Sequence, residues 1–229
     1  MPSPRIPSQA DSQTPGWLEH EAGRKILVEV QRMVIPELTR VFGQHGLYLR
    51  PSAGLSGDLS GNMLANVVSL YREDDALSGQ FRCLDPELPI STASLSLVYS
   101  LFMLETSPEP GALLQEIART LQPEGVVLLI SLNPWSLVRL RWLLRSGRAL
   151  GNSAVQGMAR DAGLDVIRHQ YLGPCRPGSD GAFAANRRIR WLDGFRAASL
   201  LVLRRREAGL TPLRKLSPAV SLRPGMSAG

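Results

Sequence analysis

A stretch rich in glycine and serine, Pro51 to Gly61, is the first place where residue types and spacing indicate chemistry. It follows Leu47-Tyr48-Leu49, a short apolar run typical of a strand. Glycines after such a strand let the backbone approach a bound cofactor, because a side chain would block the approach. Gly54 is the candidate for this close approach. The glycines do not follow the G-x-G-x-x-G pattern, and Arg50 precedes the loop, so a surface loop without a ligand is the alternative.

A second signal is Asn133-Pro134-Trp135-Ser136, directly after the aliphatic run Val126 to Ile130. Open α/β sheets place their ligands at the carboxyl ends of such buried strands. Asn133 and Trp135 are therefore candidates for contact with a substrate. The alternative is purely structural, because an asparagine can cap a helix, a proline can open it and a tryptophan can pack on the sheet.

Several other chemistries lack their signatures in this sequence. There is no G-x-S-x-G elbow and no Walker loop, so an α/β-hydrolase and a P-loop nucleotidase are not indicated. The three histidines, His20, His45 and His169, belong to separate elements and form no metal-binding pair. Cys83 and Cys175 lie far apart without a CxxC motif. We therefore expect no metal site and no disulfide framework.

The elements that position these residues are clearest between Leu88 and Trp135. Residues 94–101 predict one strand and residues 126–130 a second, fully buried strand. Between them, apolar residues recur at helical spacing from Leu113 to Leu121; Thr106 or Ser107 can cap this helix, and residues 122–125 end it. A strand that returns through a helix to a parallel neighbour predicts a Rossmann-like α/β fold, with a mostly parallel sheet and helices on both faces.

The rest of the chain is expected to complete this sheet. An apolar stripe predicts a helix from Trp17 to about Val41, bent at Pro36 and ended by the glycines at 43 and 46. The further elements are a short helix at 59–65, strands at 67–71 and 81–84, a helix at 153–163, a strand at 164–169 and an antiparallel last strand at 199–203.

At 229 residues the chain is long enough for one well-filled α/β domain. We expect a disordered leader at 1–16, the domain at 17–206 and a basic flexible tail at 207–229. The sequence has no apolar run of membrane-spanning length and no apolar core of a signal peptide near its start. These features predict a cytoplasmic protein.

Five short segments carry a resemblance to a known family. They are Leu88-Pro89-Ile90, Leu97-Val98, Leu104-Glu105, Leu114-Gln115-Glu116 and Leu121 to Gly125. Together they are similar to the second half of Rossmann-like methyltransferases that depend on S-adenosylmethionine. The segment Asn133 to Leu137 resembles that of small bacterial members of the methyltransferase type 11 group.

The resemblance implies S-adenosylmethionine as the cofactor and suggests where it binds. An acidic residue after the second strand, here Glu73, would hold the ribose hydroxyls, and Asp85 or Glu87 would contact the adenine. The full set of expected cofactor-binding residues is Leu49, Arg50, Gly54, Glu73, Asp85, Glu87, Leu88, Tyr99 and Ser100, with Asn133 and Trp135 on the substrate side.

The chain departs from the family at its fourth predicted strand. Related sequences usually carry aspartates and a histidine where this chain has Thr92, Ala93, Ser96 and Phe102. No acid or base remains at those positions, so the catalytic residue is unknown. Methyl transfer can run largely on positioning, because the sulfonium is already activated.

Two functions therefore remain as hypotheses. The first is a methyltransferase that acts on an unidentified acceptor. The second is an inactive methyltransferase-like module that contacts RNA, an anionic lipid or a protein partner. The net charge of +6 and the arginine-rich segments at 139–148 and 187–190 favour nucleic acid or an anionic surface as a partner.

Overall fold

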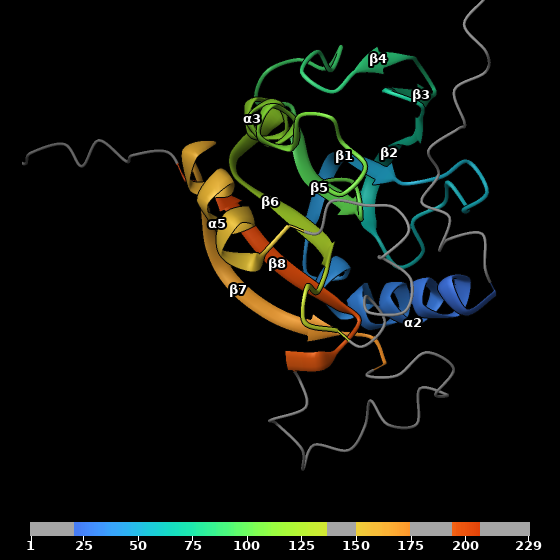
Figure 1. The fold of residues 1–229 in the computed structure, drawn as a ribbon. Coiled ribbons are helices and arrows are strands. Elements are labelled where there is room, and N and C mark those ends of the chain that lie inside the picture. Colours follow the sequence, from blue (N-terminus) through green and yellow to red (C-terminus); the bar gives the residue numbers. More distant parts are fainter. Residues whose placement is uncertain (1–20, 137–149, 175–193, 207–229) are drawn as a thin grey trace, which may run out of the picture.

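The computed structural model describes residues 21–136, 150–174 and 194–206. These residues form an eight-stranded sheet with the spatial order β4-β3-β2-β1-β5-β6-β8-β7 (Figure 1). The strands are β1 (Phe42–Arg50), β2 (Met63–Glu73), β3 (Ala76–Gly79), β4 (Cys83–Leu84), β5 (Leu95–Leu101), β6 (Leu121–Leu132), β7 (Leu164–Leu172) and β8 (Ala198–Arg205).

Helices cover both faces of this sheet (Figure 1). Helix α2 (Glu21–Leu38) packs on one face, and α3 (Pro110–Thr120) and α5 (Asn152–Asp161) pack on the other. Successive strand residues point to opposite faces and fill two apolar cores. Tyr48 and Tyr99 belong to the core under α2, whereas Leu49 and Val98 belong to the core under α3 and α5. The predicted Rossmann-like α/β class is confirmed.

The central strands are parallel and the edges are antiparallel. β1 pairs in parallel with β2 and β5, and β5 pairs in parallel with β6, which confirms the predicted crossover through α3. The pairs β2–β3, β3–β4, β6–β8 and β7–β8 are antiparallel. The last strand is antiparallel as predicted, but the sheet as a whole is less parallel than the sequence indicated.

β1 begins at Phe42, earlier than the predicted strand at 47–49. Gly43 and Gly46, which were expected to end the preceding helix, lie inside this strand. A Cβ atom on Gly43 would lie 2.3 Å from the Cβ of Ser96, and one on Gly46 would lie 2.3 Å from a methyl group of Leu64. The glycines therefore allow neighbouring side chains to cross over β1, and α2 ends at Leu38.

The predicted short helix at 59–65 is wrong, because residues 51–62 form a loop and β2 starts at Met63. Gly61 has a φ of 81°, which a helix does not allow. The side chain of Asn62 holds the turn: its Nδ2 donates to the carbonyl of Leu59 (2.7 Å), and its Oδ1 accepts from the N–H of Leu64 (2.9 Å). No helix therefore separates the parallel strands β1 and β2.

The chain also turns back sharply after β2. Asp74 adopts a φ of 53°, which aspartate tolerates in turns, and Glu73 pairs across the turn with Ala76. This hairpin forms β3, a strand that the sequence did not predict. The strand predicted at 81–84 shrinks to β4 (Cys83–Leu84). One edge of the sheet is thus a meander of short strands.

The remaining helices begin without the predicted side-chain caps. α3 starts at Pro110, and neither Thr106 nor Ser107 caps it. α5 starts at Asn152 after Gly151, again without a side-chain cap. β6 follows α3 directly, so the predicted turn at 122–125 lies within a strand.

The last two strands extend beyond their predicted ends, to Leu172 and Arg205, because they pair with each other along their whole length. The predicted leader and tail lie outside the described residues. The arginine-rich segments at 139–148 and 187–190 also lie outside them.

A buried ion pair fastens the meander to the rest of the sheet. Arg72, at the end of β2, donates through both terminal nitrogens to the carboxylate of Asp85 at 2.5 and 2.8 Å. Both side chains are almost completely buried. The hydroxyl of Ser107 also donates to Asp85, so the carboxylate joins the meander to the segment that follows β5. Burying two charges costs free energy because they lose their contact with water. The hydrogen bonds among Arg72, Asp85 and Ser107 offset much of this cost.

We expect removal of one partner of this pair to destabilise the fold strongly. Arg72→Met leaves the Asp85 carboxylate buried without its cation, which costs about 3–5 kcal/mol in comparable pairs. The free energy of unfolding, measured by urea denaturation, should fall by that order. The double variant Arg72→Met/Asp85→Leu should lose much less than the sum of the single variants. Additive losses would show that the pair does not act as a unit.

Candidate functional site

The candidate site lies at the carboxyl edge of the central strands. β1, β5 and β6 are parallel neighbours and end at Arg50, Leu101 and Leu132. The residues that follow these ends are the loop 51–62, the segment from Phe102 to Glu105, and Asn133. Open α/β sheets bind ligands at this edge, so the side chains gathered here decide what can bind.

The side chain of Arg50 takes the space between the end of β1 and the loop. Its Nη1 donates to the carbonyl of Ala53 (3.1 Å) and to that of Leu55. The guanidinium lies 5.2 Å from the centre of the Tyr71 ring, within the range of a cation–π interaction. Its Nε atom is buried and has no partner among the described residues. Arg50 is therefore engaged with the loop that was expected to approach the cofactor.

The glycines of the loop have different roles from those predicted. A Cβ atom on Gly54 would meet only the hydroxyl of Ser52, at 3.7 Å, so nothing in this arrangement requires glycine there. A Cβ on Gly57 would lie 3.3 Å from Nη2 of Arg50 and 3.3 Å from the hydroxyl of Ser69. Gly57 makes room for the arginine, and Gly54 is simply exposed.

Glu73, the predicted ribose-binding residue, ends β2 at the tight turn into β3. Its Oε2 accepts a hydrogen bond from Ser78 (2.6 Å) and lies 3.9 Å from the guanidinium of Arg82. About half of the side chain is exposed (47%). The carboxylate is accessible, but its known partners belong to the hairpin.

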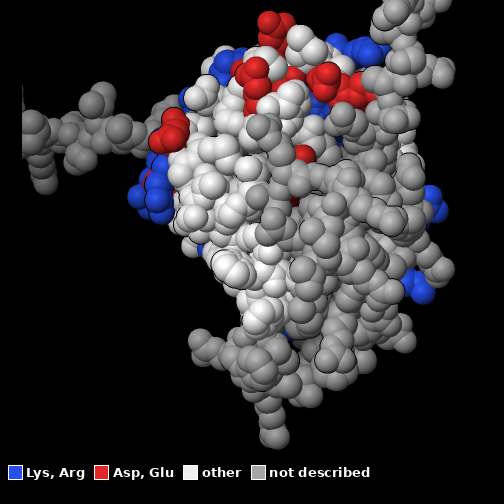
Figure 2. Space-filling model, viewed as in Figure 1, with Lys and Arg blue, Asp and Glu red and all other residues white. Residues whose placement is uncertain are grey.

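The two expected adenine-binding residues, Asp85 and Glu87, lie in different surroundings. The carboxylate of Asp85 accepts hydrogen bonds from Arg72 and Ser107, whereas Glu87, two residues later, is exposed. The N–H of Leu88 donates to Glu116 on α3 (2.9 Å), so the segment is anchored to that helix. Figure 2 shows acidic side chains gathered at this end of the visible face, over β3 and β4.

The predicted residues on β1 and β5 point to opposite faces of the sheet. Leu49 pairs with Ser100, and both are completely buried. The hydroxyl of Ser100 has no hydrogen-bond partner among the described residues. Tyr99 faces α2 and packs on Tyr48, with ring centres 5.2 Å apart. The structure therefore does not bring Tyr99 and Ser100 to one ligand surface.

Asn133 connects the end of β6 with the segment before β8. Its Nδ2 donates to the carbonyls of Gly194 (2.7 Å) and Arg196 (2.8 Å), and its Oδ1 accepts from the N–H of Trp135 (3.1 Å). Asn133 is fully buried, whereas 76% of Trp135 is exposed. The helix that Asn133 was predicted to cap would lie at 137–149, outside the described residues. Asn133 is held by the fold, and Trp135 is the residue that a substrate could touch.

Sequence reasoning missed Glu105 as a site residue. One of its oxygens accepts from the N–H of Leu132, and the other, Oε2, is buried without a partner among the described residues. Burial raises the pKa of the Glu105 carboxyl to about 7, although the hydrogen bond from Leu132 acts in the opposite direction. The available signal was a carboxylate placed shortly after a buried strand, in the Leu104-Glu105 pair.

Within the described ranges, no group of three or more His, Cys, Asp or Glu side chains is placed to hold a metal ion. The helices described there are all too short or too polar to cross a membrane.

Residues 43–129 match a known family of methyltransferase domains, type 11. Over these residues the chain is similar to the methyltransferase type 11 family. The matched range begins in β1 and ends in β6, so it includes the loop 51–62, the hairpin and Glu105. No curated protein matches the sequence.

Solved methyltransferase structures have the same fold as this methyltransferase domain. A protein from Haloferax volcanii assigned as a methyltransferase, in complex with the Trm112 activator, is 15% identical, covers 85% of this chain and 98% of its own, and has a TM-score of 0.55. One assigned as a methyltransferase from Bacillus halodurans is 14% identical over 76% of this chain and 98% of its own (TM-score 0.54). A methyltransferase from Thermotoga maritima dependent on S-adenosylmethionine is 11% identical over 83% and 94% (TM-score 0.52). At these identities the likeness concerns the fold alone.

The match to a methyltransferase domain implies S-adenosylmethionine as the cofactor. Two of the residues expected to contact it have partners inside the protein. Arg50 donates to the loop after β1, and Asp85 is bound to Arg72. The described residues therefore share the fold of the solved methyltransferases, and a cofactor at the carboxyl edge would compete with these contacts.

The raised pKa of Glu105 predicts a pH dependence of stability. The folded protein keeps this proton up to about pH 7, whereas the unfolded chain releases it near 4.5, so the contribution of Glu105 to stability falls as the pH rises between these values. Glu105→Gln keeps an acceptor for Leu132 and removes the titration. The free energy of unfolding should then decline less between pH 5 and pH 7 than in the natural protein.

The difference between the two pH profiles is the quantity to compare, because other groups affect both proteins equally. Parallel profiles would mean that Glu105 titrates normally and is not buried as described.

Proposed function

We propose that this protein transfers a methyl group from S-adenosylmethionine to an acceptor that is not yet identified. The match of residues 43–129 to a methyltransferase domain is the observation that carries the proposal. The cofactor, when bound, supplies a methyl group already activated by its sulfonium, so the protein needs mainly to hold the acceptor in line. Catalysis by positioning is consistent with the segment around β5, the fourth strand predicted from the sequence, which lacks the aspartates that are usual in the family.

Binding at the carboxyl edge requires Arg50 to leave its present position. That position is held by two hydrogen bonds, each worth about 0.5–1.5 kcal/mol, and by a cation–π contact worth about 0.5–1 kcal/mol. Displacement then costs about 1.5–4 kcal/mol, which weakens apparent affinity by roughly 10- to 1,000-fold. The cost is too small to prevent binding and large enough to make it weak.

The alternative proposal is an inactive module that uses the same scaffold to contact RNA, an anionic lipid or a protein. The engagement of Arg50 and Asp85 inside the protein is the observation that favours it. The arginine-rich segments that would make the contact lie outside the described residues. The two proposals differ in one measurable property, the binding of the cofactor.

The test is calorimetric titration of the full chain with S-adenosylmethionine and S-adenosylhomocysteine. We expect weak binding by the natural protein and binding at least about tenfold tighter by Arg50→Ala, because the cost of displacement is removed. Arg40→Ala removes an exposed arginine that follows α2 and serves as the matched control, with unchanged affinity.

Two outcomes would contradict this account. No binding by either protein at millimolar ligand would remove the methyltransferase proposal and leave the binding module. Weaker binding by Arg50→Ala would show that the guanidinium holds the cofactor instead of excluding it.

A further inference from the structure

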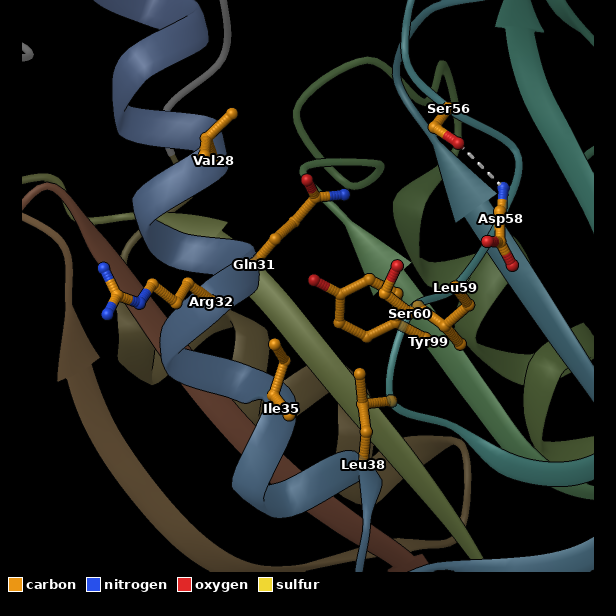
Figure 3. Close-up of a pocket in the computed structure, with 10 residues that line it drawn as sticks. All are labelled: Val28, Gln31, Arg32, Ile35, Leu38, Ser56, Asp58, Leu59, Ser60 and Tyr99. Carbon is orange, nitrogen blue, oxygen red and sulfur yellow. Dashed lines mark hydrogen bonds between the residues drawn. The ribbon is translucent and has the colours of Figure 1, made fainter.

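The described surface contains a cavity that shares only Tyr99 with the expected cofactor-binding residues. It lies between α2 and the loop after β1 and has a volume of about 250 Å³ (Figure 3). Helix α2 forms one wall, the loop residues 56–60 form the other, and Tyr99 of β5 lies between them. Ligand sites usually measure about 300–1,000 Å³, so this cavity suits a small molecule.

The polar group at the base of this cavity has no partner. Tyr99 is completely buried, and its hydroxyl makes no hydrogen bond with the described residues. Figure 3 shows the hydroxyl directed toward α2, near Gln31. The amide nitrogen of Gln31 donates to the hydroxyl of Tyr48 (2.8 Å), and within the described residues Gln31 makes no hydrogen bond to Tyr99. A buried hydroxyl without a partner costs free energy, which a ligand atom at this position would recover.

Tyr99 can act only as a neutral hydroxyl at physiological pH. Burial raises its pKa well above the usual value for tyrosine, and the neighbouring Tyr48 adds to the effect. The hydroxyl therefore remains an O–H donor. It calls for an acceptor on the ligand, such as a hydroxyl, ether or carbonyl oxygen.

The cavity lining contains one carboxylate and one guanidinium, which lie on opposite walls. Asp58 lines the loop wall, and no ion pair is formed by its carboxylate within the described part of the chain. Arg32 is the cation among the lining residues, and Figure 3 shows its guanidinium directed away from Tyr99 and the loop. A cationic group on the ligand would find a carboxylate at the loop and no facing cation.

The remaining lining is apolar and lies mainly on the helix. Ile35 and Leu38 face Leu59 across the cavity (Figure 3). An apolar ligand body between these side chains would gain about 25 cal/mol for each Å² removed from water. The three features together describe a ligand with a cationic end, an apolar body and an oxygen acceptor.

We propose that this cavity binds a small organic amine whose ammonium pairs with Asp58, whose apolar body packs between Ile35 and Leu59, and whose oxygen accepts from Tyr99. That this amine is the methyl acceptor rests on the proposed function; that it binds does not.

The test uses three probes with the full chain in the absence of S-adenosylmethionine. Tyramine carries both an ammonium and a phenol oxygen, phenethylamine lacks the oxygen, and hydroxyphenylpropionate carries a carboxylate in place of the ammonium. Calorimetry should show tyramine binding most tightly. The carboxylate probe should bind about 5- to 10-fold more weakly, because it meets Asp58 with a like charge.

Two variants assign the preference to the named groups. Asp58→Asn should bring the affinities of tyramine and hydroxyphenylpropionate together, whereas Asp165→Asn, an exposed aspartate on β7, should leave the preference unchanged. Tyr99→Phe should remove the roughly 2- to 10-fold advantage of tyramine over phenethylamine. Asp58 is exposed, so the comparison between the natural protein and Asp58→Asn can be made even if Tyr99→Phe unfolds the protein.

Equal affinity for tyramine and the carboxylate probe, or a preference that survives Asp58→Asn, would overturn the proposal. Amine binding by a protein that ignores S-adenosylmethionine would leave the amine site in place and remove the methyltransferase function. Binding of S-adenosylmethionine without a preference for the amine would leave the methyltransferase proposal in place and remove the amine site.

Discussion

An arginine keeps its positive charge inside a protein, so its guanidinium must find oxygen acceptors, and one edge of this protein is built around the buried Arg72 and the half-buried Arg50. The terminal nitrogens of Arg72 donate to Asp85, and Nη1 of Arg50 donates to the carbonyls of Ala53 and Leu55. These arginines lie near the ends of the parallel strands β2 and β1. The acceptors they require shape the loop, the hairpin and the carboxyl edge together.

This requirement explains how the sheet manages without helices between its first strands. The loop 51–62 replaces a helical crossover, and its carbonyls are held by Arg50. In the meander of β3 and β4, Leu77 packs into the apolar core, and the pair between Arg72 and Asp85 ties the meander to the segment after β5 through Ser107. Polar contacts therefore help to position both the loop and the meander.

These contacts affect where a ligand can bind. A ligand at the carboxyl edge competes with Arg50, whereas the cavity under α2 is lined by an unpartnered hydroxyl and an unpaired carboxylate. The family relation concerns residues 43–129 and the fold of the sheet, and neither fixes which side chains meet a ligand. In this chain the local contacts of Arg50 and Tyr99 decide that question.

The sequence by itself determined the elements whose signal is local. The aliphatic run at 126–130, the helical spacing from Leu113 and the short connections between them predicted the parallel pair of β5 and β6, because buried strands and amphipathic helices carry their periodicity in neighbouring residues. The sequence also pointed to Asn133 and Trp135, without showing that Asn133 is bound to Gly194 and Arg196.

Only the tertiary structure decided the features that depend on distant partners. Gly43 and Gly46 resemble a helix terminator until Ser96 and Leu64 are seen to cross over them. Asp85 resembles a free adenine contact until Arg72 is placed beside it, and Glu105 gains its raised pKa from burial against Leu132. The contacts at Ser96, Arg72 and Leu132 join positions more than ten residues apart, and no local pattern records which side chains folding will bring together.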